Sequence, residues 1–234
     1  MVANEFTIRF AAIGQWITPP TMSPESTKPC TFVYENADPH WINELCEQAQ
    51  KFDWLTPHQL QQLSTATEVI WVEQRVSVSI HRDVHDRLLM AQNGVSALRM
   101  LCKEGDVYAL LFDESQRVVR PEVLQEVDPR EATSLLHLFV ECWCDEEFAY
   151  TEGLSIFACP NLEVEAQHIN DPIAQATAFS AAAQLVCDGL VLNDQSQFRS
   201  SESFPYFTCK WSHEAEIQDE DIMNPWGLLR LSRA

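Results

Sequence analysis

The spacing of hydrophobic residues predicts a strand, a long helix and a second strand near the middle of the chain. Segment 68–80 alternates apolar and polar residues, as a strand with one buried face does. Apolar residues then recur every three or four positions from Val84 to Cys102, which places them along one face of a helix. Gly105 is a suitable C-terminal cap, and the apolar segment 106–112 predicts the next strand.

The rest of the chain is also predicted to form short strands and helices. We expect strands at 6–16, 31–36, 134–144, 149–159, 161–167, 191–192 and 206–211, helices at 56–63 and 121–127, and a proline-rich loop at 17–29. Asp38-Pro39 and Asp171-Pro172 each combine a capping carboxylate with a proline at the first helical position, so a helix should begin at each pair. A second strand–helix–strand unit is therefore expected at 161–192.

This mixture of strands and helices predicts an α+β fold. We expect a mixed, mostly antiparallel sheet with helices packed mainly on one face. The chain has 234 residues, of which 46% are apolar, so it can bury a sizeable core. We therefore expect a single compact α+β domain over 1–234, which could divide into subdomains 1–65 and 66–234.

The overall charge and the glycine content exclude several classes of partner. The chain contains 15 Lys and Arg against 35 Asp and Glu, which gives a formal net charge of −20. Such an acidic protein is unsuited to nucleic-acid phosphates and to an anionic membrane surface, so we expect neither as a partner. The 6 glycines form neither GxGxxG nor GxxxxGK[ST], the two common phosphate-binding loops.

The N-terminal residues and the cysteines indicate a reducing compartment. Glu5 stands where a signal peptide would carry basic residues, and Arg9 interrupts the apolar segment that follows. The sequence also lacks a run of about 18 apolar residues, the length of a membrane helix. We therefore expect a cytoplasmic protein whose 8 cysteines are free thiols packed among apolar residues.

Two short motifs could bind a metal ion, but simpler structural roles fit them better. His81 and His85 are four residues apart at the start of the long helix, and Arg82 stands where a zinc-protease motif would carry glutamate. Cys142 and Cys144 point to the same side of a predicted strand, without a second close cysteine pair to complete a zinc site. We expect a charged helical face and core packing, respectively, and no metal or cofactor.

Candidate catalytic residues are scattered, and we assign none of them a role. The GxSxG motif of serine hydrolases is absent. Two pairs lie close enough in sequence to be considered as thiol nucleophiles, Cys159 with His168 and Cys209 with His213. Glu163 and Glu165 share one side of a predicted strand, where they could act as acid and base or bind a cation. We favour instead the solvent face of an edge strand.

Residues 150–165, YTEGLSIFACPNLEVE, resemble the signature of an uncharacterised bacterial family, a domain of unknown function. The shared pattern is T-x-G-L followed by E-[LV]-E, and the matching residues are Thr151, Gly153, Leu154, Glu163, Val164 and Glu165. An alanine-rich helix follows, and the segment 118–124 matches an upstream V-x-x-PEVL, so the resemblance covers 66–195. Some relatives look like neighbours of toxin or secretion genes, which implies a protective or accessory role.

Acidic residues are concentrated in the second half of the chain. Segment 131–198 contains eleven Asp and Glu and no Lys or Arg, a net charge of −11. Such a field speeds the encounter with a basic protein and orients it, although a merely solubilising surface is the alternative. The residues that we expect to bind a partner are Glu141, Asp145, Glu146, Glu147, Glu152, Glu163 and Glu165.

Taken together, these patterns predict a non-catalytic binding protein of the immunity or inhibitor type. It would mask a basic partner, such as a bacterial toxin domain, through its acidic surface. The alternatives are an enzyme that uses Cys or Glu/Asp in a cleft, and an adaptor subunit of a secretion system. A deep cleft with converging polar groups would favour the enzyme, and an acidic face would favour the binding protein.

Overall fold

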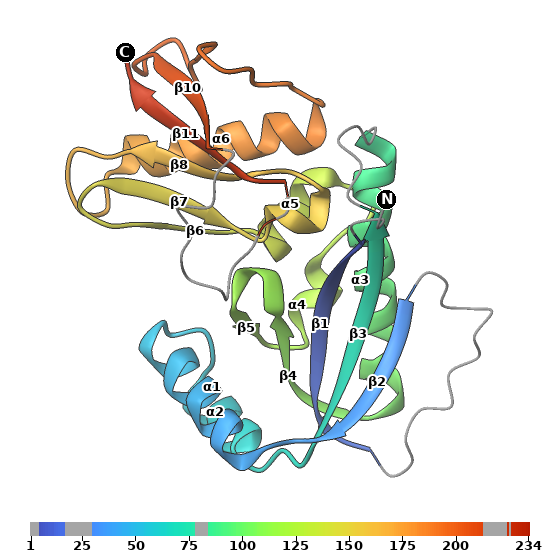
Figure 1. The fold of residues 1–234 in the computed structure, drawn as a ribbon. Coiled ribbons are helices and arrows are strands. Elements are labelled where there is room, and N and C mark those ends of the chain that lie inside the picture. Colours follow the sequence, from blue (N-terminus) through green and yellow to red (C-terminus); the bar gives the residue numbers. More distant parts are fainter. Residues whose placement is uncertain (1–4, 17–29, 78–83, 213–223, 225) are drawn as a thin grey trace. The chain divides into compact units, whose positions relative to one another are not determined.

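A computed structural model of the chain confirms the α+β class (Figure 1). It describes residues 5–16, 30–77, 84–212, 224 and 226–234. These residues form six α-helices and two mostly antiparallel sheets. Within the same ranges, no helix has both the length and the apolar character that crossing a membrane requires.

Contacts group the chain into two compact units. The first unit comprises Glu5–Ser77 and Met90–Arg130, and the second unit includes Glu131–Ala234. The boundary between these units does not lie at residue 65, where the expected subdomains 1–65 and 66–234 would meet. Strands from both sides of residue 65 pair within one sheet. Whether the chain folds as a single domain stays a prediction.

The sheet of the first unit has five strands. Their order is β2-β3-β1-β4-β5, with every neighbour antiparallel. The strands are β1 (Glu5–Gln15), β2 (Cys30–Asn36), β3 (Glu68–Ser77), β4 (Asp106–Phe112) and β5 (Arg117–Val119). The register of β1 shifts between Ile13 and Gly14, where a Cβ atom would lie 2.1 Å from the carbonyl oxygen of Asp106. Glycine is therefore required at that bulge because the two backbones approach so closely.

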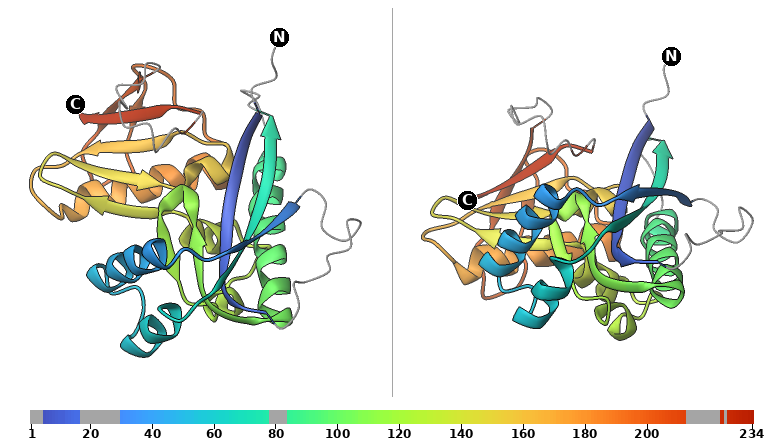
Figure 2. Two further views of the ribbon diagram at one scale, coloured as in Figure 1. Left: turned by 60° about the horizontal axis from the view of Figure 1, so that its bottom comes forward. Right: turned by 90° about the horizontal axis from the view of Figure 1, so that it is seen from below.

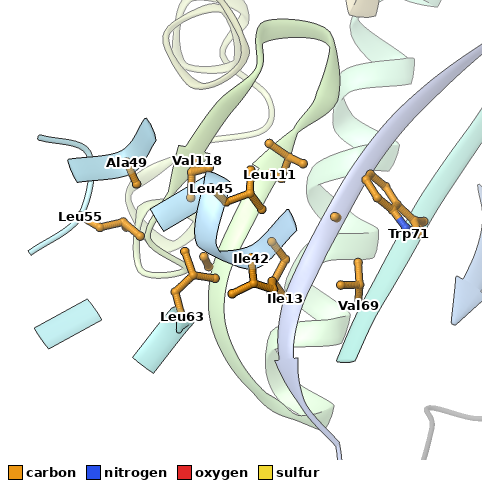
Figure 3. Packing of buried hydrophobic residues seen from close by; sticks show 12 residues of the cluster. Ile13, Ile42, Leu45, Ala49, Leu55, Leu63, Val69, Trp71, Leu111 and Val118 are labelled. Atoms are coloured by element: carbon orange, nitrogen blue, oxygen red, sulfur yellow. The ribbon is translucent and has the colours of Figure 1, made fainter. Parts of the chain in front are cut away.

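Helices cover both faces of this first sheet. On one face, Ala11, Ile13 and Trp71 belong to one buried cluster with residues of α1 (Pro39–Lys51) and α2 (Pro57–Leu63). Figure 3 labels Ile13 and Trp71 in this cluster. On the other face, the ring of Phe10 lies against α3 (Val84–Glu104), which runs beside these strands in both views of Figure 2. Successive side chains of a strand point to opposite faces, so the buried segment of β1 from Phe10 to Ile13 is apolar on both sides.

The second unit contains a six-stranded sheet with the order β6-β7-β8-β11-β10-β9. Its strands are β6 (Glu141–Cys144), β7 (Phe148–Glu152), β8 (Asn161–Glu165), β9 (Gln197–Phe198), β10 (Phe207–Ser212) and β11 (Leu228–Arg233). Only the β8–β11 pair is parallel among the pairs of this sheet that the structure describes. Helix α6 (Pro172–Cys187) packs against β6, β7 and β8. The strand order places β11 inside the sheet, between β8 and β10.

Helix starts were predicted well because their capping chemistry is local. Asp38 accepts a hydrogen bond from the backbone N–H of His40, and Asp171 caps α6 through the N–H groups of Ile173 and Ala174. A short α4 (Val123–Glu126) lies within the predicted helix 121–127. The helix over 84–102 is also present, although the segments 17–29 and 78–83 lie outside the described residues.

Three predicted strands are wrong in whole or in part. Segment 134–144 is divided between α5 (Ala132–Phe139) and β6, because a short apolar run suits a buried helix as well as a strand. The strand expected over 149–159 ends at Glu152, since Gly153 adopts a φ of 89° and turns the chain into a 3-10 helix. The described residues 191–192 form no strand.

Candidate functional site

The side of the second sheet that faces away from α6 gathers charged and aromatic residues. Side chains on the α6 side are buried or half-buried, and the thiol of Cys142 lies 3.9 Å from the carbonyl oxygen of Gln175 in α6. Alternate positions point the other way. This outer face, as we name it, comprises Glu141, Trp143, Phe148, Tyr150, Glu152, Glu163, Glu165, Lys210 and Arg230.

Strand register aligns five of these residues in one row. Trp143 lies opposite Tyr150, which lies opposite Glu163, which in turn lies opposite Arg230 and then Lys210. Side chains at directly opposed positions are close enough to interact. The row therefore joins an aromatic pair at the β6 edge to an ion pair in the middle of the sheet.

The aromatic pair is formed by Trp143 and Tyr150, whose rings stack with centroids 4.2 Å apart and an interplanar angle of 22°. Phe148 meets Tyr150 edge to face at 6.0 Å. Trp143 is 42% exposed although its ring is held on one side by Tyr150. A large aromatic side chain that is both ordered and solvent-accessible is a frequent anchor in protein interfaces.

Glu163 and Glu165 lie on the outer face but not on an edge strand, so that part of the sequence interpretation is wrong. The strand β8 lies between β7 and β11. Glu163 Oε2 accepts a hydrogen bond from Arg230 Nε at 2.7 Å and forms an ion pair with Arg230 Nη2 at 2.6 Å. Glu165 accepts the backbone N–H of Arg233 at 2.8 Å. Both carboxylates hold the C-terminal strand, which is 67 or 68 residues away along the chain.

Asp145 organises the turn that joins β6 to β7. Its Oδ1 accepts the backbone N–H groups of Glu147 at 2.7 Å and Phe148 at 2.8 Å, and its Oδ2 accepts the hydroxyl of Tyr150 at 3.0 Å. Burial alone would raise the pKa of Asp145, but these three hydrogen bonds hold it below its ordinary value. Glu146 and Glu147, by contrast, are exposed at the tip of this turn.

Glu141 and Glu152 lie opposite each other at the β6 edge. Burial raises the pKa of Glu152, a hydrogen bond from the Trp143 indole opposes that rise, and the negative charge of Glu141 adds to it. Two like charges side by side disfavour ionisation, so a cation placed nearby would be stabilised. The predicted acidic residues therefore form two groups. Asp145, Glu163 and Glu165 hold the structure together. The others lie at the β6 edge or at the tip of its turn: Glu141, Glu146, Glu147 and Glu152.

The residues of the T-x-G-L motif have structural roles in the crossing from β7 to β8. Thr151 is buried and its hydroxyl accepts the backbone N–H of Leu162 at 2.8 Å. Gly153 has the positive φ that the turn needs, and the carbonyl of the buried Leu154 accepts the N–H of Cys159 at 3.1 Å. The motif builds this turn, which gives a physical reason for its spacing.

The sequence candidates for nucleophilic or metal chemistry are mostly structural. All eight cysteines are free, three of them buried and five half-buried. Burial raises the pKa of Cys142 to about 12, so its thiol is protonated at neutral pH. Within the described residues no cluster of three His, Cys, Asp or Glu side chains could hold a metal ion. His81, His213 and the side chain of His85 lie outside those residues.

Of the two candidate cysteine–histidine pairs, only Cys159 with His168 lies wholly within the described residues. The thiol of Cys159 is buried and donates a hydrogen bond to the carbonyl of Phe157 at 3.5 Å. His168 is exposed, with Nδ1 lying 3.1 Å from the carbonyl oxygen of Ile169. Each of these two side chains therefore contacts the carbonyl oxygen of a residue next to it or two positions away in the sequence.

The first unit contains an open hollow of about 530 Å³. It is lined by Gln62, Cys102, Gly105, Asp106, Val107, Tyr108, Pro121, Glu122 and Gln125. Burial raises the pKa of Cys102 to about 11, and the negative charge of Glu122 adds to the rise. The thiol in this hollow is thus a weak nucleophile at neutral pH.

Comparisons of the chain with protein-family models, with curated proteins and with solved structures find no match. The resemblance of residues 150–165 to a bacterial family of unknown function therefore stays a prediction. Sequence reasoning identified the carboxylates of the outer face but missed Trp143, Tyr150 and Arg230. Their proximity depends on strand register, and the only local signal was an aromatic residue between two inward cysteines.

Proposed function

We propose that this chain is a cytoplasmic, non-catalytic binding protein of the immunity or inhibitor type, which masks a basic protein partner with the outer face of its second sheet. One observation carries the proposal. At the β6 edge, acidic residues surround the exposed Trp143, which stacks on the half-buried Tyr150: Glu141 and Glu152 lie beside Trp143, and the exposed Glu146 and Glu147 lie at the adjoining turn.

This arrangement suits protein recognition because it joins two separate contributions. Interfaces obtain most of their binding energy from a few central residues, among which Trp and Tyr are enriched, while a polar rim surrounds them. Charges on the rim speed the encounter with an oppositely charged partner and fix its orientation. Trp143 and Tyr150 supply the centre, and the carboxylates of the edge and the turn supply a rim of one sign.

Immunity proteins are expected to bind their partner and to protect the cell that contains both. The experiment begins with capture of partners by the full chain from a lysate of the source cells. The same capture uses the double variant Glu146→Lys and Glu147→Lys, which leaves the structural Asp145 intact. A matched control reverses two exposed carboxylates of the first unit, Glu47→Lys and Glu104→Lys, with the same change in net charge.

The proposal predicts a basic protein that the wild type and the control retain and that the double variant loses. Expression of that protein alone should be toxic to the cell or should produce an enzymatic activity of that protein. Co-expression of this chain should suppress the toxicity or the activity. The proposal is contradicted if both double variants capture the same proteins as the wild type, or if the captured protein is equally harmful with and without this chain.

A further inference from the structure

Arginine side chains in this protein repeatedly use one mode of binding, in which a guanidinium lies over an aromatic ring and also meets a carboxylate. Three arginines of the described residues do so. Arg9 lies 4.0 Å from the centroid of the Trp71 ring and 3.3 Å from a carboxylate oxygen of Glu73. The same two distances are 4.8 Å to Phe148 and 2.6 Å to Glu163 for Arg230, and 5.8 Å to Phe207 and 2.9 Å to Asp171 for Arg233.

Trp143 and Glu152 form the same combination of ring and carboxylate at the β6 edge. The indole donates a hydrogen bond to Glu152, and one face of its ring is occupied by Tyr150. Among the residues that the structure describes, no Lys or Arg lies over the Trp143 ring. The ring nevertheless remains 42% exposed.

We propose that Trp143 and Glu152 bind the guanidinium of an arginine side chain that a protein partner supplies. This inference rests on the proposed function, since it names the chemical group that the outer face recognises. The incoming guanidinium stacks on the free side of the indole and donates to the Glu152 carboxylate, as Arg230 does with Phe148 and Glu163 on the same face.

Arginine fits this pair better than lysine does. A guanidinium is planar, stacks on aromatic rings and presents several N–H donors in a fixed plane, whereas an ammonium is a compact and more strongly hydrated charge. The Trp143 ring is also already ordered, because Tyr150 stacks beneath it and Asp145 holds the Tyr150 hydroxyl at 3.0 Å. Order that exists before binding lowers the entropic cost of association.

The electrostatic surroundings favour a cation at the same place. Glu141 lies opposite Glu152, and the sequence has no Lys or Arg from residue 131 to residue 198. Burial and the charge of Glu141 raise the pKa of Glu152, and a cation beside the carboxylate would oppose that rise because it stabilises the ionised form. Arginine binding and ionisation of Glu152 should therefore support each other.

Fluorine NMR of the full chain labelled with fluorotryptophan tests the proposal, with the signal of Trp143 assigned by the variant Trp143→Phe. The probes are three blocked peptides of identical length that carry arginine, lysine or citrulline at the same positions. We expect the arginine peptide to shift the Trp143 signal saturably and to bind at least about threefold more tightly than the lysine peptide. The uncharged citrulline peptide should leave the signal unchanged.

Two variants separate the roles of the ring and the carboxylate. Glu152→Gln should weaken the arginine peptide at least about threefold, because an ion pair becomes a neutral hydrogen bond. The exposed control Glu47→Gln on α1 should bind like the wild type. Equal affinities for the arginine and lysine peptides, an unmoved Trp143 signal, or an unchanged affinity in Glu152→Gln would overturn the proposal.

The partner captured in the preceding experiment distinguishes this inference from the proposed function. If Trp143→Leu and Glu152→Gln weaken that partner together with Glu146→Lys and Glu147→Lys, both ideas are supported. If only the turn variant weakens it, the proposed function stands and the arginine site is refuted. If neither the turn variant nor the variants of Trp143 and Glu152 weaken it, the proposed function itself fails.

Discussion

The two sheets of this protein differ in how their faces are used. In β1 of the first sheet, four consecutive residues from Phe10 to Ile13 are fully buried, because helices lie on both sides. In β7 and β8 of the second sheet, buried and half-buried residues alternate, because α6 covers one side. The first sheet is thus built for stability, and the second keeps a face on which charged and aromatic residues can be placed without entering the core.

The largest expected effect is on the stability of the first unit. Phe10→Ala removes a fully buried ring that packs against Phe112 and α3, and it should lower the free energy of unfolding by about 3–5 kcal/mol. The control Phe52→Ala removes a ring that is 54% exposed, and it should cost less than about 1 kcal/mol. Urea unfolding measures both. Equal losses would mean that the two-sided burial of β1 does not determine the stability of this unit.

An intermediate effect is expected for the ion pair that crosses the second sheet. Arg230→Met leaves the carboxylate of Glu163 half-buried without its partner, which should destabilise the fold by about 1–3 kcal/mol. Lys210→Met, at the exposed end of the same row, should change stability by less than about 0.5 kcal/mol. If the double change of Glu163 and Arg230 to leucine restores most of the loss, the cost lies in the unpaired charge, as expected.

A smaller effect is the stabilisation that ionised Asp171 provides at neutral pH and that acid removes. Burial would raise the pKa of Asp171, but hydrogen bonds from the N–H groups of Gln167, Ile173 and Ala174, together with the charge of Arg233, hold it below the ordinary value. The unfolded chain therefore takes up this proton at a higher pH than the folded chain. The stabilisation is complete above the ordinary aspartate pKa of about 4 and is lost as the pH falls through the lower folded value.

The variant Asp171→Asn provides the measurement for this acid effect. Asparagine still caps a helix but carries no charge to pair with Arg233, whose Nη2 lies 2.9 Å from the carboxylate. Urea unfolding at neutral pH should show the variant to be less stable than the wild type, and the difference should shrink as the pH falls below about 4. A difference that stays constant with pH would assign the loss to geometry and not to charge.

The sequence was sufficient for features that depend on neighbouring residues. Asp38 and Asp171 were predicted as helix caps because the cap and the first turn are contiguous, and the apolar spacing located α3. The acidic stretch of the second half was also visible as composition. These features need no knowledge of which strands lie side by side.

The remaining features depend on contacts between distant segments. The pairing of Glu163 with Arg230 joins residues 67 positions apart, and nothing near Glu163 indicates that β11 will lie beside β8. The run that includes Leu135 and Leu138 forms a helix although its sequence predicts a strand, because a short apolar stretch does not distinguish a strand from a buried helix. The stack of Trp143 on Tyr150 likewise requires the β6–β7 register, which alternation alone does not specify.

The measurement that tests the central claim most directly is the rate of association with the basic partner at two salt concentrations. For the wild type and the control Glu47→Lys with Glu104→Lys, the rate should be fast at low salt and fall as added salt screens the charges to a range of about 8 Å. Glu146→Lys with Glu147→Lys should slow association at low salt, with an unchanged free energy of unfolding and little further dependence on salt. A double variant that associates as fast as the wild type, with the same salt dependence, would contradict the account and leave the acidic half of this chain as a solubilising surface.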